Sequence, residues 1–209
     1  MPADLNSALS FFNSALEYIA DSGLEQELSW QRTIDFGDFT ETQLLREAAW
    51  VILCSGFRES IIRRIFDHVS LSFCDWESAE LIVKSRRLCR AAASASFRNE
   101  QKLEAICETA ERIHLCGFCS FKTEVLQNPI ARLQSLPYIG PITAVHLAKN
   151  LGLDVAKPDR HLVRLSHEFG YTCAAELCGD IARATGEQVN VVDLALWRYM
   201  ADVQPALQA

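Results

Sequence analysis

Residues 136–144 read Leu136-Pro137-Tyr138-Ile139-Gly140-Pro141-Ile142-Thr143-Ala144, a tight turn that leads directly into an apolar helix. Proline disfavours helical geometry in the residue before it, so Pro137 ends the short helix that precedes the turn. Pro141 suits the first position of the next helix. The amides of Ile142 and Thr143 are then free at the positive end of a helix dipole, which is an anion-binding arrangement. The alternative is an ordinary helical hairpin that serves only packing.

A second segment, Lys157-Pro158-Asp159-Arg160-His161, follows the turn at a short distance in sequence. Asp159 lies nineteen residues after Gly140, whose missing side chain frees the turn and lets another backbone approach. An aspartate after a proline and before a helix is a favourable N-cap. An ionised carboxylate is also the group that stabilises a developing positive charge. The two roles are compatible, because a capping aspartate can still face a substrate.

Together these segments resemble the helix-hairpin-helix and Gly/Pro-Asp element of base-excision DNA glycosylases of the endonuclease III superfamily (HhH-GPD). The resemblance covers about residues 41–172 and is specific at 136–164. It implies an all-α, two-lobed fold with a groove between the lobes. It also implies an enzyme that flips a damaged or modified base from double-stranded DNA and hydrolyses its N-glycosidic bond with the help of Asp159.

The same resemblance implies the remaining contacts of the hairpin. Backbone carbonyls of Gln134, Leu136 and Ile139 would hold a monovalent cation, Na⁺ or K⁺, that bridges to a DNA phosphate. The residues expected to contact DNA are Tyr138, Ile139, Gly140, Ile142, Thr143, His161 and Arg58.

Two departures from the family pattern are informative. Bifunctional members carry a lysine, which forms a Schiff base, where this chain has Ile142. We therefore expect a monofunctional enzyme that uses water. Many relatives also bind an iron–sulfur cluster through four cysteines, but here Cys173 and Cys178 stand alone after the aspartate, so we expect neither a cluster nor any required cofactor.

Base recognition depends on aromatic and turn residues, because a flipped base is held against rings. By analogy, the turn after Trp50–Cys54 fills the gap left by the base, which makes Ser55, Phe57 and Arg58 candidates for that role. Phe57 could equally be a core residue. Trp30 and Phe36 are candidates for the base pocket.

The charge balance opposes DNA binding at first sight. The net charge is −7 and the isoelectric point is near 5.3, whereas phosphate contacts need Lys and Arg. Positive charge is nevertheless concentrated in the middle third of the chain, and a solvated mixed-charge surface is the alternative interpretation. The residues concerned are Arg58, Arg63, Arg64, Lys84, Arg86, Arg87, Arg90, Arg98 and Lys102.

Apolar residues recur at spacings of three and four throughout, which predicts an all-α protein. Helices are expected at 4–20, 44–53, 60–69, 76–83, 85–94, 100–114, 129–136, 141–151, 159–169, 174–186 and 189–201. We expect residues 1–40 to form a helix and an irregular segment that pack on the C-terminal lobe, residues 41–128 to form one lobe, and residues 129–209 to form the other, with the hairpin at 129–151.

The chain contains no apolar run of roughly 20 residues and no secretory signal, so we expect no membrane association. A cytoplasmic protein follows, associated with the nucleoid or, in a eukaryote, in the nucleus, and we expect a monomer. The eight cysteines are then reduced. Cys116 and Cys119 have C-x-x-C spacing, for which structural, zinc-binding and redox roles all remain open.

Three rival interpretations remain. The first is a bifunctional glycosylase/lyase with a displaced lysine. The second is a non-catalytic helix-hairpin-helix DNA-binding protein, and the third is a helical interaction module in which the hairpin is only structural. The sequence does not identify the base that is excised.

Overall fold

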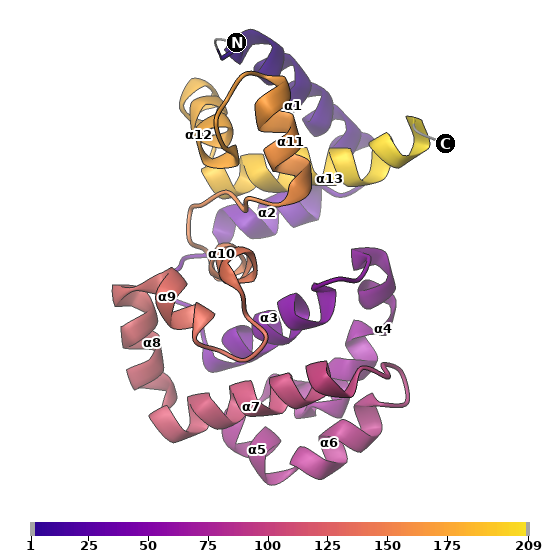
Figure 1. Cartoon of the computed structure of the whole chain (residues 1–209), viewed down its shortest axis with the longest axis vertical. Helices are drawn as coiled ribbons and strands as arrows, with labels where there is room; N and C mark the ends of the chain where they lie inside the picture. The colour runs from indigo at the N-terminus through magenta and orange to yellow at the C-terminus, as the bar shows by residue number, and fades with distance from the viewer. Residues whose placement is uncertain (1–2, 208–209) are drawn as a thin grey trace. The chain divides into compact units, whose positions relative to one another are not determined.

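The computed structural model describes residues 3–207, and every regular element in them is helical (Figure 1). The α-helices are α1 (Leu5–Asp21), α2 (Glu25–Thr33), α3 (Glu41–Cys54), α4 (Glu59–Ser72), α5 (Ala79–Lys84), α6 (Arg86–Ala93), α7 (Glu100–Cys116), α8 (Phe118–Gln127), α9 (Pro129–Gln134), α10 (Pro141–Asn150), α11 (Arg160–Glu168), α12 (Ala174–Thr185) and α13 (Val189–Leu207), with a 3-10 turn at Cys74–Trp76. The prediction of an all-α fold is confirmed. Within the described part of the chain, no helix has the length and hydropathy of a transmembrane span.

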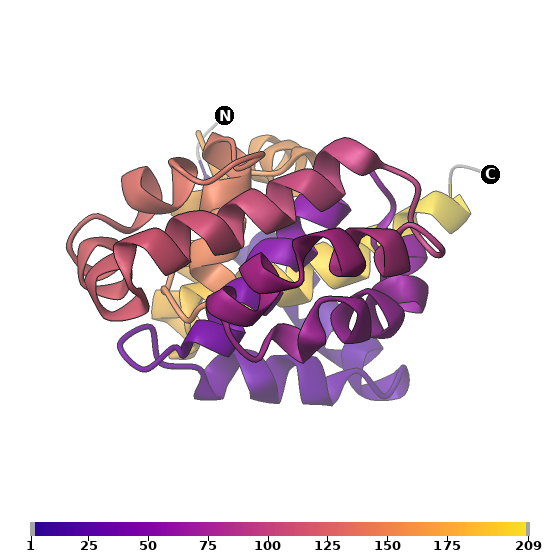
Figure 2. The ribbon, with the colours of Figure 1, turned by 90° about the horizontal axis from the view of Figure 1, so that it is seen from below.

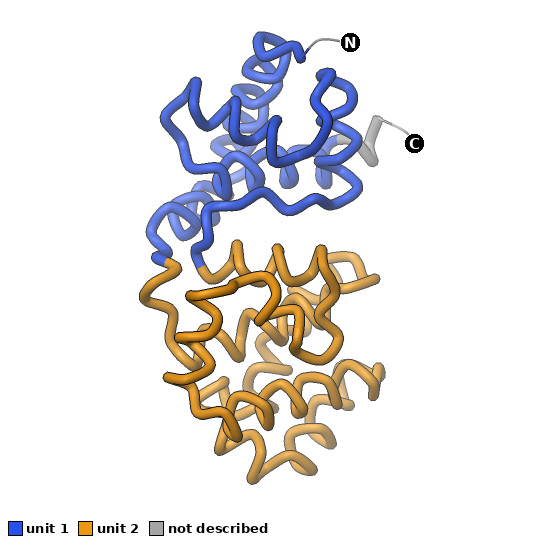
Figure 3. Tube along the Cα trace, turned by 60° about the vertical axis from the view of Figure 1, so that its left-hand side comes forward, with its two compact units in different colours: residues 1–35, 152–209 blue, residues 36–151 orange. Residues whose placement is uncertain are grey.

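The chain forms two compact units (Figure 3). Unit 1 combines Met1–Asp35 with Gly152–Ala209, and unit 2 is the continuous segment Phe36–Leu151. The hairpin at 129–151 therefore belongs to unit 2, whereas we expected it to share a lobe with Asp159. The physical reason is that α10 packs on α9 and α3, both of which lie in unit 2.

Unit 1 has a core built from both ends of the chain. Helix α1 packs against α13 and α12, and it buries Phe12 in a cluster with Leu165, Ile181 and Leu196. Helix α2 also packs on α13, where Arg198 forms a part-buried ion pair with Glu27 at 2.7 Å. Residues 24–40, expected to be irregular, thus contain a helix that is stabilised by tertiary contacts.

Unit 2 is centred on α3, which lies between α7 and α10 (Figure 1). Its start is fixed by a capping box, in which the Thr40 hydroxyl accepts from the Gln43 amide and the Gln43 side chain accepts from the Thr40 amide. Helices α5 and α6 pack against α7 (Figure 2). Helix α8 was not predicted. The structure shows that Gly117, at φ 78°, turns the chain between two helices.

A buried polar contact joins α3 to α10 in unit 2. Asn150 Nδ2 donates to Glu47 Oε2 at 2.9 Å, and Arg46 pairs with the other carboxylate oxygen. Burial raises the pKa of the Glu47 carboxyl, and Arg46 opposes that shift. This contact fixes the C-terminal end of α10, and hence the direction of the hairpin helix.

Candidate functional site

The hairpin in unit 2 has the geometry that the sequence predicts. Helix α9 ends at Gln134, and α10 begins with Gly140 as N-cap and Pro141 in its first turn. The carbonyl of Gly140 accepts the first intrahelical bond, from the Ala144 amide at 2.8 Å. The amides of Ile142 and Thr143 therefore belong to the first turn of α10, where helix geometry provides no intrahelical acceptor.

The strained residue of the turn is Tyr138 and not Gly140. Gly140 has φ −86° and ψ −179°, a conformation open to any residue, whereas Tyr138 has φ 65°. The expectation that Gly140 supplies conformational freedom is therefore wrong. A Cβ at Gly140 would meet no atom within 4 Å, so this glycine leaves open space in front of the turn.

Gly140→Ala tests whether Gly140 is needed for the backbone conformation of the turn or for the open space in front of it. We expect the free energy of unfolding to stay the same or rise by up to about 1 kcal/mol, because alanine fits this backbone and restricts the unfolded chain. DNA affinity should fall about tenfold, because the methyl group enters the space through which a phosphate approaches the amides. Thermal melting and fluorescence anisotropy with a labelled duplex measure the two effects. Unchanged affinity would remove the hairpin from the interface.

The side chains of the hairpin divide between surface and core. Tyr138 and Ile142 are 44% and 49% exposed, while Leu136 and Ile139 are buried. Ile139, predicted to contact DNA, therefore presents only its backbone. The predicted cation ligands are backbone carbonyls at the end of α9 and in the turn. The Leu136 carbonyl already accepts from the Ile139 amide at 3.3 Å and keeps a second lone pair.

The turn between α3 and α4 supplies the next group of candidates. Ser55, Phe57 and Arg58 are all exposed, and Gly56 makes the turn at φ 75°. Phe57 is 41% exposed and rests one edge against Phe97, with ring centroids 5.3 Å apart. It is thus a surface aromatic on a hydrophobic support, so the alternative of a core residue is wrong.

Lys102 is a residue of this region whose environment the sequence analysis missed. It is only 2% exposed, and its Nζ donates to the Leu53 carbonyl at 2.7 Å and to the Ser55 carbonyl. The signal was present in α7, where Lys102 shares an apolar stripe with Ile106 and Ile113. A lysine on such a stripe needs a buried partner.

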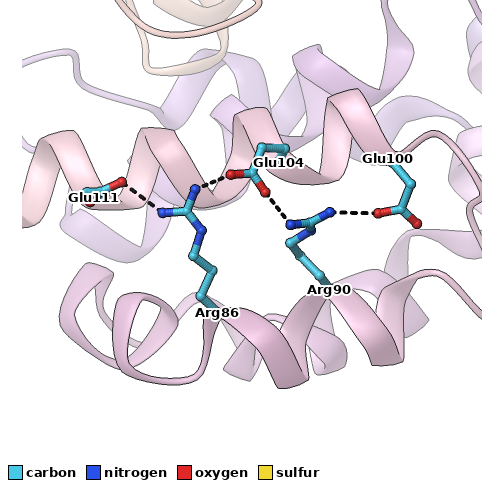
Figure 4. Close-up of polar contacts among 5 residues, drawn as sticks. All are labelled: Arg86, Arg90, Glu100, Glu104 and Glu111. Atoms are coloured by element: carbon cyan, nitrogen blue, oxygen red, sulfur yellow. Dashed lines mark hydrogen bonds and ion pairs between the residues drawn. The ribbon is translucent and has the colours of Figure 1, made fainter.

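Four of the nine basic residues of the middle third form ion pairs with carboxylates. Arg86 pairs with Glu104 and Glu111, and Arg90 pairs with Glu100 and Glu104 (Figure 4). Ion pairs also join Arg63 to Glu59 and Lys84 to Glu80. Carboxylates one helical turn away or on α7 neutralise these four side chains, so they form a mixed-charge surface, the alternative interpretation for this region.

A groove of about 540 Å³ adjoins the hairpin. Pro137 and Tyr138 line it together with residues of α7, among them Glu100, Glu104 and Glu108. Arg90 lines it as well and pairs with Glu100 and Glu104, so the groove has a mixed-charge wall beside the hairpin.

The pairing of four of the nine basic side chains predicts weak salt dependence. Because these cations are already neutralised by carboxylates, the slope of log K against log salt should be about −2 to −3, shallow for a duplex-binding protein. Anisotropy titrations between low and physiological salt measure it. A slope much steeper than this would show that the paired arginines release their carboxylates on binding.

Asp159 lies in unit 1 and caps α11. Its Oδ1 accepts from the amides of His161 and Leu162 at 2.9 and 3.1 Å, and its Oδ2 lies 3.7 Å from Lys157 Nζ. The side chain is 13% exposed. The capping role that the sequence predicts is therefore present, and one carboxylate oxygen is not used by the cap.

The segment before Asp159 is fastened to α13 by two aspartates that the sequence analysis did not single out. The Asp193 carboxylate accepts from the Lys157 amide at 3.1 Å, and the Asp154 carboxylate accepts from the Asn190 amide at 2.9 Å. Asp193 is buried. These bonds hold the extended segment 152–158 and so fix the position of Asp159.

The remaining candidates are divided between the units. His161 is half-buried beside Asp159, and burial lowers its pKa while the aspartate opposes that shift. Trp30 is an exposed residue of α2 in unit 1, whereas Phe36 lies in unit 2 against Phe39, with ring centroids 5.8 Å apart. Neither unit by itself brings these two aromatics together.

The C-x-x-C pair belongs to no metal site in the described part of the chain. Cys116 lies 3.8 Å from an Arg132 nitrogen, and among residues 3–207 no three His, Cys, Asp or Glu side chains form a metal-binding group.

Comparison with known proteins identifies the fold. No known protein-family profile matches the chain, and no curated protein matches it in sequence. Two solved structures are similar over nearly the whole chain. One is the 8-oxoguanine DNA glycosylase of Thermotoga maritima, with a TM-score of 0.61 and 19% identity over 95% of this chain and 98% of that one.

The other is the 8-oxoguanine glycosylase/lyase of Methanocaldococcus jannaschii in complex with a 15mer DNA containing 8-oxoguanine. Its TM-score is 0.56 at 19% identity, over 90% of this chain and 95% of that one. At this identity the likeness establishes a shared fold. The chain therefore has the all-α fold of these two DNA glycosylases, as the hairpin and the aspartate segment predict.

Proposed function

We propose that this protein is a monofunctional DNA N-glycosylase. Unit 2 binds duplex DNA through the hairpin, and Asp159 of unit 1 promotes cleavage of the N-glycosidic bond of an extruded nucleotide. The observation that carries the proposal is the hairpin itself, in which two first-turn amides face open space above a glycine. The shared fold with two DNA glycosylases supports it.

The proposed chemistry follows from the position of Asp159. Departure of the base leaves positive charge on the sugar, and a carboxylate held beside C1′ stabilises that charge. The cap bonds through Oδ1 fix the side chain and leave Oδ2, which lies 3.7 Å from Lys157 Nζ, outside the cap. Water then attacks C1′, because Ile142 offers no amine. Burial lowers the pKa of His161 and so favours its neutral ring, which donates a hydrogen bond to a phosphate.

Both similar structures are named for 8-oxoguanine, so we propose an oxidised purine as the substrate and 8-oxoguanine as the first base to test. The experiment is incubation with a panel of lesion-bearing duplexes, followed by alkali to reveal abasic sites. Cleavage of the 8-oxoguanine duplex alone supports this substrate. Cleavage of another member redefines the base, and no cleavage of any member contradicts the glycosylase proposal.

The second candidate is a glycosylase/lyase, which the name of the Methanocaldococcus jannaschii neighbour favours. Borohydride trapping separates the two candidates, because only a Schiff base between a lysine and the sugar gives a covalent DNA adduct.

The remaining parts of the proposal concern binding. The protein acts as a monomer on double-stranded DNA. The carbonyls of Gln134, Leu136 and Ile139 hold Na⁺ or K⁺, which supplies a positive contact for a phosphate. Oxygen ligands at a helix C-terminus, where carbonyls lack intrahelical partners, fit such an ion.

A further inference from the structure

A buried lysine lies behind the two surface turns of unit 2. Lys102 is in the first turn of α7, and its Nζ donates to the carbonyls of Leu53 and Ser55. Those carbonyls end α3, where the helix dipole is negative and acceptors lack intrahelical partners. The ammonium therefore caps α3 from the neighbouring helix and fixes the start of the turn 55–58.

The same ammonium contacts an aromatic ring from each turn. Nζ lies 4.6 Å from the ring centre of Phe57 and 5.6 Å from that of Tyr138. Both distances are within the range of cation–π attraction. Phe57 belongs to the turn after α3, and Tyr138 belongs to the hairpin, so a single charge joins two segments that are far apart in sequence.

Tyr138 holds this position despite an unfavourable backbone. Its φ of 65° costs a non-glycine residue roughly 1 kcal/mol or more. The contact with Lys102 helps to offset that strain.

We propose that Lys102 is a positioning residue that joins the turn 55–58 to the hairpin and presents the two as one DNA-binding surface. This proposal rests on the proposed function, because it assumes that both turns face DNA. It goes beyond that function in assigning a role to a residue that itself has almost no exposed surface.

The charge of Lys102 changes within an accessible pH range. Burial lowers its pKa to about 8, and the Cys54 thiol on α3 opposes that shift. The Tyr138 phenol and the Arg58 guanidinium are the titratable or charged groups of the two turns, residues 137–140 and 55–58, and the hairpin helices add Arg132, His146 and Lys149. Above this pH the amine is neutral and no longer attracts the two rings.

The effects of pH on stability and on binding therefore have opposite signs. Because the folded-state pKa lies below the ordinary value of 10.5, the unfolded chain binds more protons between pH 8 and 10.5. The contribution of Lys102 to stability rises with pH across that window. DNA affinity should fall in the same window, because the neutral Lys102 no longer holds the two turns together through its contacts with Phe57 and Tyr138. A merely structural lysine would not produce the second effect.

The test is fluorescence anisotropy with a duplex that contains a stable abasic-site analogue, at fixed ionic strength from pH 6.5 to 9.5. Wild-type affinity should fall about five- to tenfold as pH rises through 8. Lys102→Arg stays charged and should show a flat profile, while Lys102→Met should bind weakly at every pH. Lys122→Met is the matched control, because Lys122 makes the same two kinds of contact with Phe39 alone. It should follow the wild type.

Two further measurements keep the proposal testable if Lys102→Met does not fold. Phe57→Leu and Tyr138→Leu each remove one ring and should each reduce the pH dependence. NMR titration of the Lys102 side chain should give a pKa near 8 in the free protein and a higher value with DNA bound.

Failure of the Lys102 proposal and failure of the proposed function give different results. If the wild type binds DNA but has the same pH profile as Lys102→Arg, the positioning role of Lys102 is wrong and the proposed function still stands. If no variant binds DNA at any pH, both proposals fall.

Discussion

Asp159→Asn should lose base excision by at least about 100-fold while the protein stays folded. Asparagine is as good an N-cap as aspartate, so its side-chain oxygen keeps the bonds from His161 and Leu162. What it loses is the negative charge that the proposed mechanism places beside the sugar. Single-turnover excision kinetics on the accepted duplex measure the loss, and thermal melting shows that the fold is retained.

Asp159→Ala is the companion variant, because it removes both the charge and the cap. We expect the same loss of excision together with a fall of about 1 kcal/mol in the free energy of unfolding. The pair separates catalysis from capping. Full activity of Asp159→Asn on every accepted substrate would leave the carboxylate with only its structural role.

Ile142→Lys should convert the enzyme to a glycosylase/lyase. Ile142 is 49% exposed, so a lysine is tolerated there with a change in stability within about 0.5 kcal/mol. The new amine attacks C1′ of the abasic sugar, water leaves as the Schiff base forms, and β-elimination then breaks the strand. Borohydride should trap a covalent adduct with abasic DNA that the wild type does not form.

Ile142→Arg is the matched control for this gain of activity. It adds a positive charge at the same exposed position but has no amine that forms a Schiff base, so it should tighten DNA binding without trapping. Two results would contradict the assignment of position 142. One is a trapped adduct with the wild type, and the other is none with Ile142→Lys although that variant binds abasic DNA.

The parts of the site that the sequence predicts correctly depend on local rules. Proline in the first turn of α10 and the Asp159 cap each involve residues within a few positions of one another. Such patterns can be recognised in the sequence, because the local backbone conformation alone brings the groups together.

The parts that the sequence analysis missed depend on distant partners. The pairing of Arg86 with Glu111, the burial of Lys102 under the α3 carbonyls and the support of Lys157 by Asp193 all join residues from different helices. The left-handed turn at Tyr138 was missed for another reason. Glycine usually occupies a left-handed position, so we assigned the conformational freedom of the turn to Gly140, two residues after Tyr138.

The division of the chain into units has a consequence for how it folds during synthesis. Phe36–Leu151 is continuous, so it can complete its packing as it leaves the ribosome. Helix α1 precedes that segment in the chain, yet its apolar face packs on α13, which follows it. That face must stay unpaired while the whole of Phe36–Leu151 is synthesised, so the nascent chain carries an uncovered apolar helix throughout that interval.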